Sequence, residues 1–223
     1  MNLLTDLLPT KVYIEEYTVK INPDFRTMIQ IDILFKDTSI DESQKWKTAF
    51  DLFYIDIPFF INEHYFILLA ENLISFYSCG HYIENSNKEN KASNENREHD
   101  HRHTNQDEKK TSNLKPIFCF KFDAEYIYSA FLHDYKIDLQ KENLHWWVFN
   151  SLFKNLSEEN EFVKIMKYRS IEIDKDMSPK EKEFYRKMKK RYALPTTERK
   201  VDVEHKNALE EALLKGESID HLV

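Results

Sequence analysis

Only two glycines, Gly80 and Gly216, occur in the 223 residues of the chain. Glycine supplies the left-handed backbone conformations that tight turns and phosphate-binding loops need. A β-sandwich or a Rossmann-like fold is therefore hard to build from this sequence, and helices are favoured. The chain is long enough to bury a core, and 14% of its residues are aromatic. We expect a mainly α-helical protein, a multi-helix orthogonal bundle.

The N-terminal region departs from this helical pattern. In KVYIEEYTVKI, residues 11–21, apolar and polar side chains alternate on both sides of Glu15 and Glu16, which predicts a small β-hairpin. Three stretches with apolar residues at helical spacing follow it and predict an array of helices. The expected boundary residues of these helices are Pro23 with Asp24, Asp41 with Gln44 as a capping box, Pro58 and, at the end, Gly80.

Polar residues dominate between Glu84 and Asn113. These thirty positions hold seven asparagines, thirteen charged residues and one apolar residue, Ala92. Such a segment buries too little apolar surface to offset the entropy that it would lose on ordering. We therefore expect one long disordered loop at 84–113, inserted into a single helical domain over residues 1–195.

The second half of the chain carries further boundary signals. CFKF at 119–122 is a candidate short strand that could pair with the N-terminal hairpin, and Asp123 is a candidate cap for the next helix. Residues 196–223 are expected to form a polar linker and a C-terminal helix. The other expected helix starts are Asn143, Ser157 and Ser178, the last followed by Pro179 and Glu181 in a complete start signal.

No constellation of residues in the sequence supports catalysis. The three histidines of EHDHRH, residues 98–103, could hold a transition metal, but they lie in the expected disordered loop without residues to orient them. Cys119 with His133 or His145 could form a pair of thiol and base, although the phenylalanines on both sides of Cys119 indicate an inert thiol. We expect no enzyme activity, no cofactor and no metal site.

Charge and cysteine content limit the surroundings in which the chain works. The formal net charge of −7 argues against a binder of nucleic acid or of anionic membranes. The two cysteines, Cys79 and Cys119, do not indicate a disulfide framework, and the sequence shows neither a signal peptide nor a membrane-spanning run. We expect a protein of a reducing cytosol that is not attached to a membrane.

Two features are candidate partner-binding sites. Trp147 is about 100° from Trp146 on a helix, so this helix is either buried on two sides or presents Trp147 to another chain. In the helix EKEFYRKMKKRYAL, Phe184, Met188 and Tyr192 are the expected buried stripe, and the cations form either a solvated face or a basic patch. The candidate residues are Trp147, Arg186, Lys187, Lys190 and Arg191.

Seven motifs follow one another outside the loop at 84–113: NPDFR, FDAEYIYSAFL, YKIDL, LHWW, LFKNLSEE, FVKIMKYRSIEI and YRKMKKRYALP. In this order they resemble the phage "gene product fifteen" family of long-tailed phages and prophages of Gram-positive bacteria. The resemblance implies a tail-assembly chaperone, a helical protein that coats the tape-measure protein while tail-tube subunits polymerise. It carries over this role and no catalytic or ligand-binding residue.

We therefore expect a non-enzymatic phage tail-assembly chaperone that acts in the host cytoplasm. The resemblance implies the tape-measure protein and the tail-tube subunits as its partners, with self-association as a further possibility. Two alternatives remain open. One is a minor structural protein of the tail or of the head–tail joint, and the other is a nucleic-acid-binding regulator that uses the basic face at 186–191.

Overall fold

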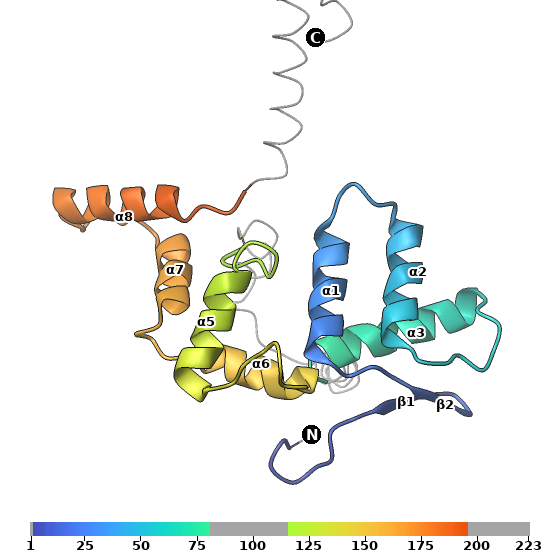
Figure 1. The fold of residues 1–223 in the computed structure, drawn as a ribbon. Helices are drawn as coiled ribbons and strands as arrows, with labels where there is room; N and C mark the ends of the chain where they lie inside the picture. The colour runs from blue at the N-terminus through green and yellow to red at the C-terminus, as the bar shows by residue number, and fades with distance from the viewer. Residues whose placement is uncertain (1, 81–115, 196–223) are drawn as a thin grey trace, which may run out of the picture. The chain divides into compact units, whose positions relative to one another are not determined.

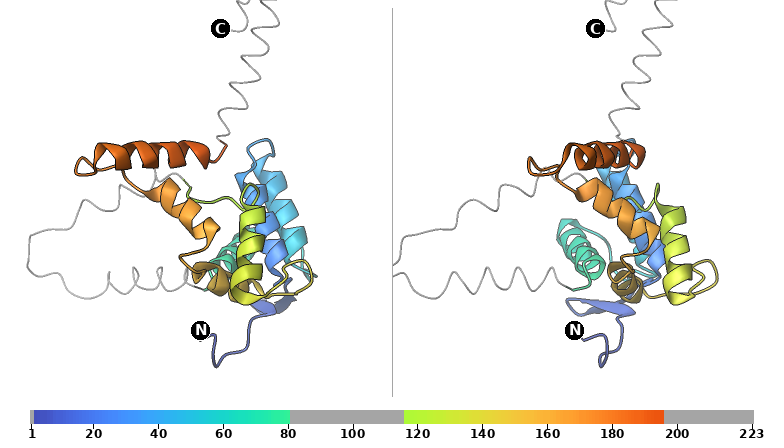
Figure 2. Two further views of the ribbon diagram at one scale, coloured as in Figure 1. Left: turned by 60° about the vertical axis from the view of Figure 1, so that its left-hand side comes forward. Right: turned by 90° about the vertical axis from the view of Figure 1, so that its left-hand side faces the viewer.

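The computed structural model describes residues 2–80 and 116–195 (Figures 1 and 2). In these residues it has seven α-helices and one two-stranded hairpin near the N-terminus, which confirms the predicted fold class. The chain divides into two compact units, Met1–Lys164 and Ile165–Val223. The predicted disordered loop at 84–113 and the predicted linker and helix at 196–223 lie outside the described residues. The predicted domain boundary at residue 195 stays a prediction.

The hairpin consists of β1 (Lys11–Ile14) and β2 (Tyr17–Lys20), which pair antiparallel with Ile14 opposite Tyr17. Glu15 and Glu16 form its turn, as predicted, and Glu15 has a φ of 51°. Side chains in a strand alternate between two faces, and Ile14 and Val19 on one of them are buried. The hairpin therefore packs one face on the core and leaves the other to solvent.

Three helices follow the hairpin: α1 (Phe25–Lys36), α2 (Glu42–Phe53) and α3 (Glu63–Tyr77). α1 and α2 form a helical hairpin, and Figure 1 shows α3 lying across this pair. Each helix begins after a side chain that accepts a backbone N–H of the first turn, which is a favourable cap. The capping residues are Asp24 for α1, Asp41 for α2 and Asn62 for α3.

The predicted boundaries of these helices are right in position and wrong in two details. Pro23 is not the first residue of α1, because its carbonyl accepts the Trp146 N–H at 2.7 Å and the chain stays extended through Asp24. Gln44 does not reach back to the start of α2, since its side-chain amide donates to Thr48 Oγ1 at 3.4 Å. The predicted stop at Gly80 is confirmed, because the backbone turns to a φ of 83° there, just after the end of α3.

The next helices of the first unit are α5 (Ala124–Tyr135), α6 (Trp146–Lys154) and the start of α7 (Glu161–Ser170). The prediction of a short strand at CFKF, residues 119–122, is wrong. Asp123 Oδ2 accepts the Cys119 N–H at 2.9 Å, and the Cys119 carbonyl accepts the N–H groups of Phe122 and Asp123, so this segment is a turn. Asp123 stands at the N-cap position of α5, as predicted, but its side chain makes no capping bond to that helix.

Two predicted helix starts are also wrong by a few residues. Asn143 does not open α6, because its side chain accepts a bond from Arg26 at 3.4 Å and the capping residue is His145. Ser157 opens a turn and not α7, because its carbonyl accepts the Asn160 N–H at 3.0 Å. In both places a polar residue that is typical of a helix start makes another hydrogen bond instead of capping the helix.

Stacked phenylalanines form the centre of the first unit. The ring of Phe149 on α6 stacks on Phe25 of α1 and on Phe131 of α5, with centroid distances of 4.8 and 4.9 Å and interplanar angles of 12° and 5°. Phe131 and Phe149 have no exposed surface. The aromatic content of the sequence therefore supplies the core, as expected.

In the second unit, α8 (Pro179–Arg191) has the predicted start in full. The Ser178 hydroxyl accepts the Glu181 N–H at 3.3 Å, and the Glu181 carboxylate accepts the Ser178 N–H at 2.8 Å. Proline stands at the first helical position, where a missing N–H costs no hydrogen bond. This reciprocal cap fixes the start of α8 through local contacts alone.

The end of α8 is held by the last turns of α7 within the same unit. Tyr168 stacks on Tyr192 with ring centroids 6.0 Å apart. Arg169 Nε donates to the Tyr192 carbonyl at 2.6 Å, and Lys189 Nζ donates to the Arg169 carbonyl at 3.2 Å. Ring stacking and side-chain hydrogen bonds to backbone carbonyls, with little burial, thus define this contact.

Candidate partner-binding site

The candidate residue Trp147 lies on α6 and is buried, with 8% of its surface exposed. Its indole N–H donates to the Phe76 carbonyl at 2.8 Å, and the indole N–H of Trp146 donates to the Tyr77 carbonyl at 2.8 Å. A helix end leaves such carbonyls without an i+4 partner, so the two indoles stabilise the end of α3. Of the two alternatives, α6 is the helix buried on two sides. A contact between Trp147 and a partner stays a prediction.

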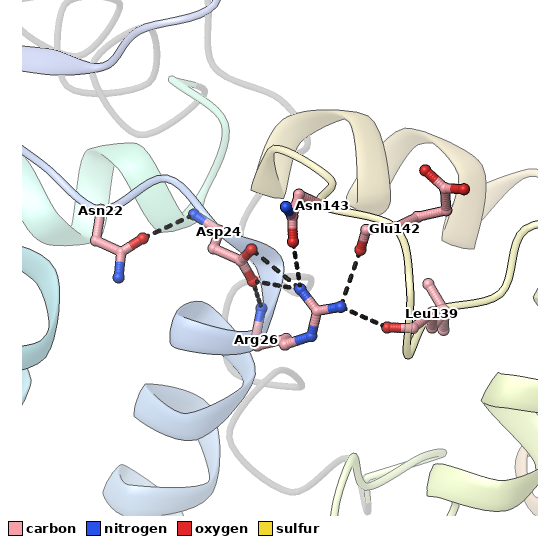
Figure 3. Close-up of polar contacts among 6 residues, drawn as sticks. All are labelled: Asn22, Asp24, Arg26, Leu139, Glu142 and Asn143. Atoms are coloured by element: carbon pink, nitrogen blue, oxygen red, sulfur yellow. Dashed lines mark hydrogen bonds and ion pairs between the residues drawn. The ribbon is translucent and has the colours of Figure 1, made fainter.

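Arg26 fixes the loop that leads into α6 (Figure 3). The Asp24 carboxylate accepts a hydrogen bond from the Arg26 guanidinium at 3.1 Å. The guanidinium also donates to the carbonyls of Leu139 at 2.7 Å and of Glu142 at 2.9 Å. Asn143 Oδ1 accepts a further bond from it at 3.4 Å. The motif NPDFR therefore works as a structural clamp that positions the motif LHWW.

His145 connects the clamp to the N-terminal segment. Its Nδ1 accepts the Trp147 N–H at 3.1 Å, and its Nε2 lies 3.0 Å from the Pro9 carbonyl. Because a backbone N–H only donates and a carbonyl only accepts, the neutral ring with its proton on Nε2 satisfies both bonds. Burial lowers the pKa of His145, which favours this neutral form.

The predicted basic face on α8 is exposed. Arg186, Lys187, Lys190 and Arg191 all have exposed side chains on this one helix. Residues 165–195 contain ten lysines and arginines against five aspartates and glutamates, a local excess of positive charge in a chain of net charge −7. Four of the five candidate residues therefore share one surface, and Trp147 belongs to the other unit.

The predicted buried stripe of α8 is wrong. Phe184 is 48% exposed, Met188 and Tyr192 are half-buried, and α8 has no buried residue. Within residues 165–195, Phe184 makes edge-to-face contacts with two rings, with centroid distances of 6.1 Å to Tyr168 and 5.3 Å to Tyr185. Helical spacing of apolar residues thus identifies the helix here without identifying a buried face.

The sequence interpretation missed a second surface, at the loop between α2 and α3. Figure 1 shows this loop beside the tip of the β1–β2 hairpin. Phe59 packs inward, with its ring 4.3 Å from Tyr65 and 4.8 Å from Tyr17. The next two residues, Phe60 and Ile61, are 86% and 39% exposed. The run IPFFI was the available signal, because it continues no helical stripe and a run of exposed apolar residues is unusual without a function.

Backbone hydrogen bonds and caps hold this loop at both ends. The Ile55 N–H donates to the Lys20 carbonyl of β2 at 3.0 Å. At the other end, Asn62 Oδ1 accepts the Tyr65 N–H at 2.9 Å. His64 Nε2 lies 2.7 Å from a Glu15 carboxylate oxygen, and this hydrogen bond lowers the pKa of Glu15. The exposed apolar side chains thus project from a fixed loop.

Apolar and acidic side chains alternate along the outer face of α3. Residues three, four and seven apart share one face of a helix. Ile67 and Ile74 are 51% and 36% exposed, and the glutamates between and before them are exposed as well. Further exposed carboxylates come from Glu15, Glu16 and Asp56 nearby. We define the α3 surface as the exposed residues Phe60, Ile61, Glu63, Ile67, Glu71 and Ile74.

Metal-ligand and thiol groups were the other candidates for chemistry. Residues 2–80 and 116–195 contain no group of three or more side chains that could hold a metal ion, and the EHDHRH histidines lie outside them. His133 Nδ1 bonds to Asp134 at 2.8 Å, and His145 bonds as described above. Cys79 and Cys119 are free thiols. Each imidazole that was paired with Cys119 in the sequence thus has other partners.

A cavity of about 310 Å³ lies between the end of α3 and α6. Aromatic rings form most of its wall, including those of Tyr77, Phe118 and Phe153. Asn150 and Lys154 are its polar groups on α6. The Asn150 side-chain amide already donates to Cys79 Sγ at 2.9 Å, and burial raises the pKa of that thiol. The cavity is thus an apolar space beside the core.

Comparisons with known proteins identify the family. No helix in the two described stretches is long and apolar enough to cross a membrane. No curated protein and no solved structure matches the chain. A family model described as Bacteriophage Gp15 protein matches residues 4–194, which include the hairpin, the clamp, the α3 surface and α8. The chain therefore belongs to the bacteriophage Gp15 protein family.

Proposed function

We propose that this protein is a non-enzymatic tail-assembly chaperone that acts in the host cytoplasm on the tape-measure protein and on tail-tube subunits. The observation that carries the proposal is the family match over residues 4–194, which makes the chain a structural or assembly protein of bacteriophages. Among the roles open to such a protein, a chaperone needs contact surfaces and no reacting groups.

Two exposed surfaces support a role in binding other chains. The α3 surface presents apolar side chains on a fixed helix and loop, and contiguous exposed apolar residues mark interaction sites on soluble proteins. The basic face of α8 offers charged groups for a second contact. A chaperone that must release its client is well served by such partly polar surfaces, because they bind without the large apolar area of a permanent complex.

Co-expression with the tape-measure protein of the same phage tests the proposal. We expect the tape-measure protein to be soluble and to elute with this chain in size-exclusion chromatography, and to be insoluble without it. An insoluble tape-measure protein in both cultures would contradict the chaperone role. The matched control is co-expression with an unrelated acidic helical protein of similar size, which should give no rescue.

Two other roles would give different experimental results. A minor structural protein would remain in purified virions at fixed stoichiometry, whereas a chaperone is absent from them, and mass spectrometry of virions separates the two. The exposed cations of α8 are the observation that favours a nucleic-acid-binding regulator. That role requires DNA binding that falls steeply with salt and weakens when Lys187, Lys190 and Arg191 become alanine.

A further inference from the structure

We propose that the α3 surface is the client-binding site, and that it takes an amphipathic helix whose apolar stripe is flanked by lysine or arginine. This inference rests on the proposed function and assigns it a place and a chemistry. The α3 surface lies on the first unit and contains none of the residues that the sequence had singled out on α6 and α8.

The shape of the α3 surface fits a helix. Ile67 and Ile74 are seven residues apart on one face of α3 and expose 51% and 36% of their surfaces. That spacing is the one at which two packed helices meet along a seam. Phe60 and Ile61, on the loop just before α3, add two further exposed apolar side chains. A stripe of about two turns on a client helix would match the roughly 10 Å between Ile67 and Ile74, and a longer stripe would be needed to reach the loop.

The loop makes this surface ready to bind. Phe59 is wedged against Tyr65 and Tyr17, and the Ile55 N–H is tied to β2. Ordering a loop during binding costs free energy that would weaken the complex. In the free protein these contacts already order the loop, so binding would not need to order it. Phe60 can therefore act as an anchor on a rigid support.

The charges of the surface select the client. Glu63 and Glu71 flank Ile67 at a distance of four residues on either side, and Glu16 and Asp56 lie at the hairpin tip and in the loop. Among the residues that the structure describes, no lysine or arginine forms an ion pair with these four carboxylates. Lysine or arginine beside the client's stripe would supply the missing partners, and an acidic client would be repelled.

The test uses the full-length protein and two synthetic helical peptides as probes. Both peptides carry the same leucine stripe, one with flanking lysines and the other with flanking glutamates. By fluorescence anisotropy we expect the lysine peptide to bind about tenfold more tightly or better, since complementary charge separates partners of equal apolar surface. Equal affinity for the two peptides would overturn the proposed charge selection.

Matched variants locate the binding site. Glu63→Lys with Glu71→Lys should lower the affinity for the lysine peptide by about tenfold and raise that for the glutamate peptide. The control pair Glu125→Lys with Glu159→Lys makes the same change in net charge at exposed positions elsewhere in the first unit. An equal loss in both pairs would show general attraction to an acidic protein and would overturn the site.

The apolar half of the surface has its own pair of variants. Ile67→Ser should lower the affinity for the lysine peptide by about tenfold. Leu132→Ser, at a residue of similar exposure on α5, should leave this affinity unchanged. In the co-expression assay, a tape-measure protein that stays soluble with Ile67→Ser would overturn the site and leave the chaperone role intact. Peptide binding that depends on Ile67, without any rescue of the tape-measure protein, would support the site and contradict the chaperone role.

Discussion

α6 is covered on two sides, whereas α8 has no buried residue, although both helices carry aromatic residues at helical spacing. The difference lies in what their neighbours provide. Around α6, the carbonyls at the end of α3 accept both indole N–H groups, and two phenylalanines stack on Phe149. Around α8, the contacts within the second unit include a capping box, ring contacts of Tyr168 with Tyr192 and Phe184, and side-chain hydrogen bonds to backbone carbonyls. One helix is thus held by burial, and the other by local ring contacts and hydrogen bonds with little burial.

The largest effect should come from removing a ring of the buried helix. Phe149→Ala should lower the free energy of unfolding by about 3–5 kcal/mol, because a cavity would open between Phe25 and Phe131. The same substitution on the exposed helix, Phe184→Ala, should change it by less than about 0.5 kcal/mol. Urea denaturation followed by circular dichroism measures both. Similar losses in the two variants would erase the distinction between the helices.

A smaller effect should come from opening the clamp that positions α6. Arg26→Ala should cost about 1–3 kcal/mol, because the carbonyls of Leu139 and Glu142 lose a charged donor. Arg26→Lys should recover only part of this loss, since a single ammonium cannot reproduce the fork of the guanidinium. The measurement is again the free energy of unfolding in urea. Full stability in Arg26→Ala would mean that packing alone places α6.

The smallest effect should appear as a dependence of stability on pH. Because the pKa of His145 is lowered below its ordinary value of 6.5, the folded protein binds fewer protons at this site than the unfolded chain. Its contribution to stability is therefore present above about pH 6.5 and is lost as the pH falls below that value. His145→Asn keeps a capping oxygen without the titration, so the wild type should lose stability relative to this variant between pH 7.5 and 5.5. Parallel pH profiles of the two proteins would exclude the effect.

Local signals explain how much of this fold the sequence could predict. The hairpin turn at Glu15 and Glu16 and the capping box at Ser178 depend on neighbouring residues only, and both predictions are confirmed. Asn143 and Ser157 carry equally good local signals, yet their predictions are wrong, because Asn143 binds Arg26 from far along the chain and Ser157 closes a turn. A cap signal in a sequence does not tell whether a loop will use the same polar group.

The candidate surfaces were predictable in part for a related reason. The outward direction of the α8 cations followed from helical periodicity, but the exposure of Phe184 did not, because periodicity does not reveal whether another element covers the stripe. The α3 surface escaped prediction because Ile67 and Ile74 share their helix with a buried stripe. Only the packed structure separates the two faces of that helix.

The Arg26 clamp also bears on the order of events during synthesis. The guanidinium meets a carbonyl 113 residues further along the chain, so this contact cannot form until Leu139 has been made. Until then α1 lacks Phe149, the ring that covers Phe25 in the finished fold. Contacts between residues so far apart in sequence slow folding, and the nascent N-terminal half presents an uncovered apolar face in the meantime. During its synthesis, the first helices of this proposed chaperone thus lack the contacts that cover their apolar face in the folded protein.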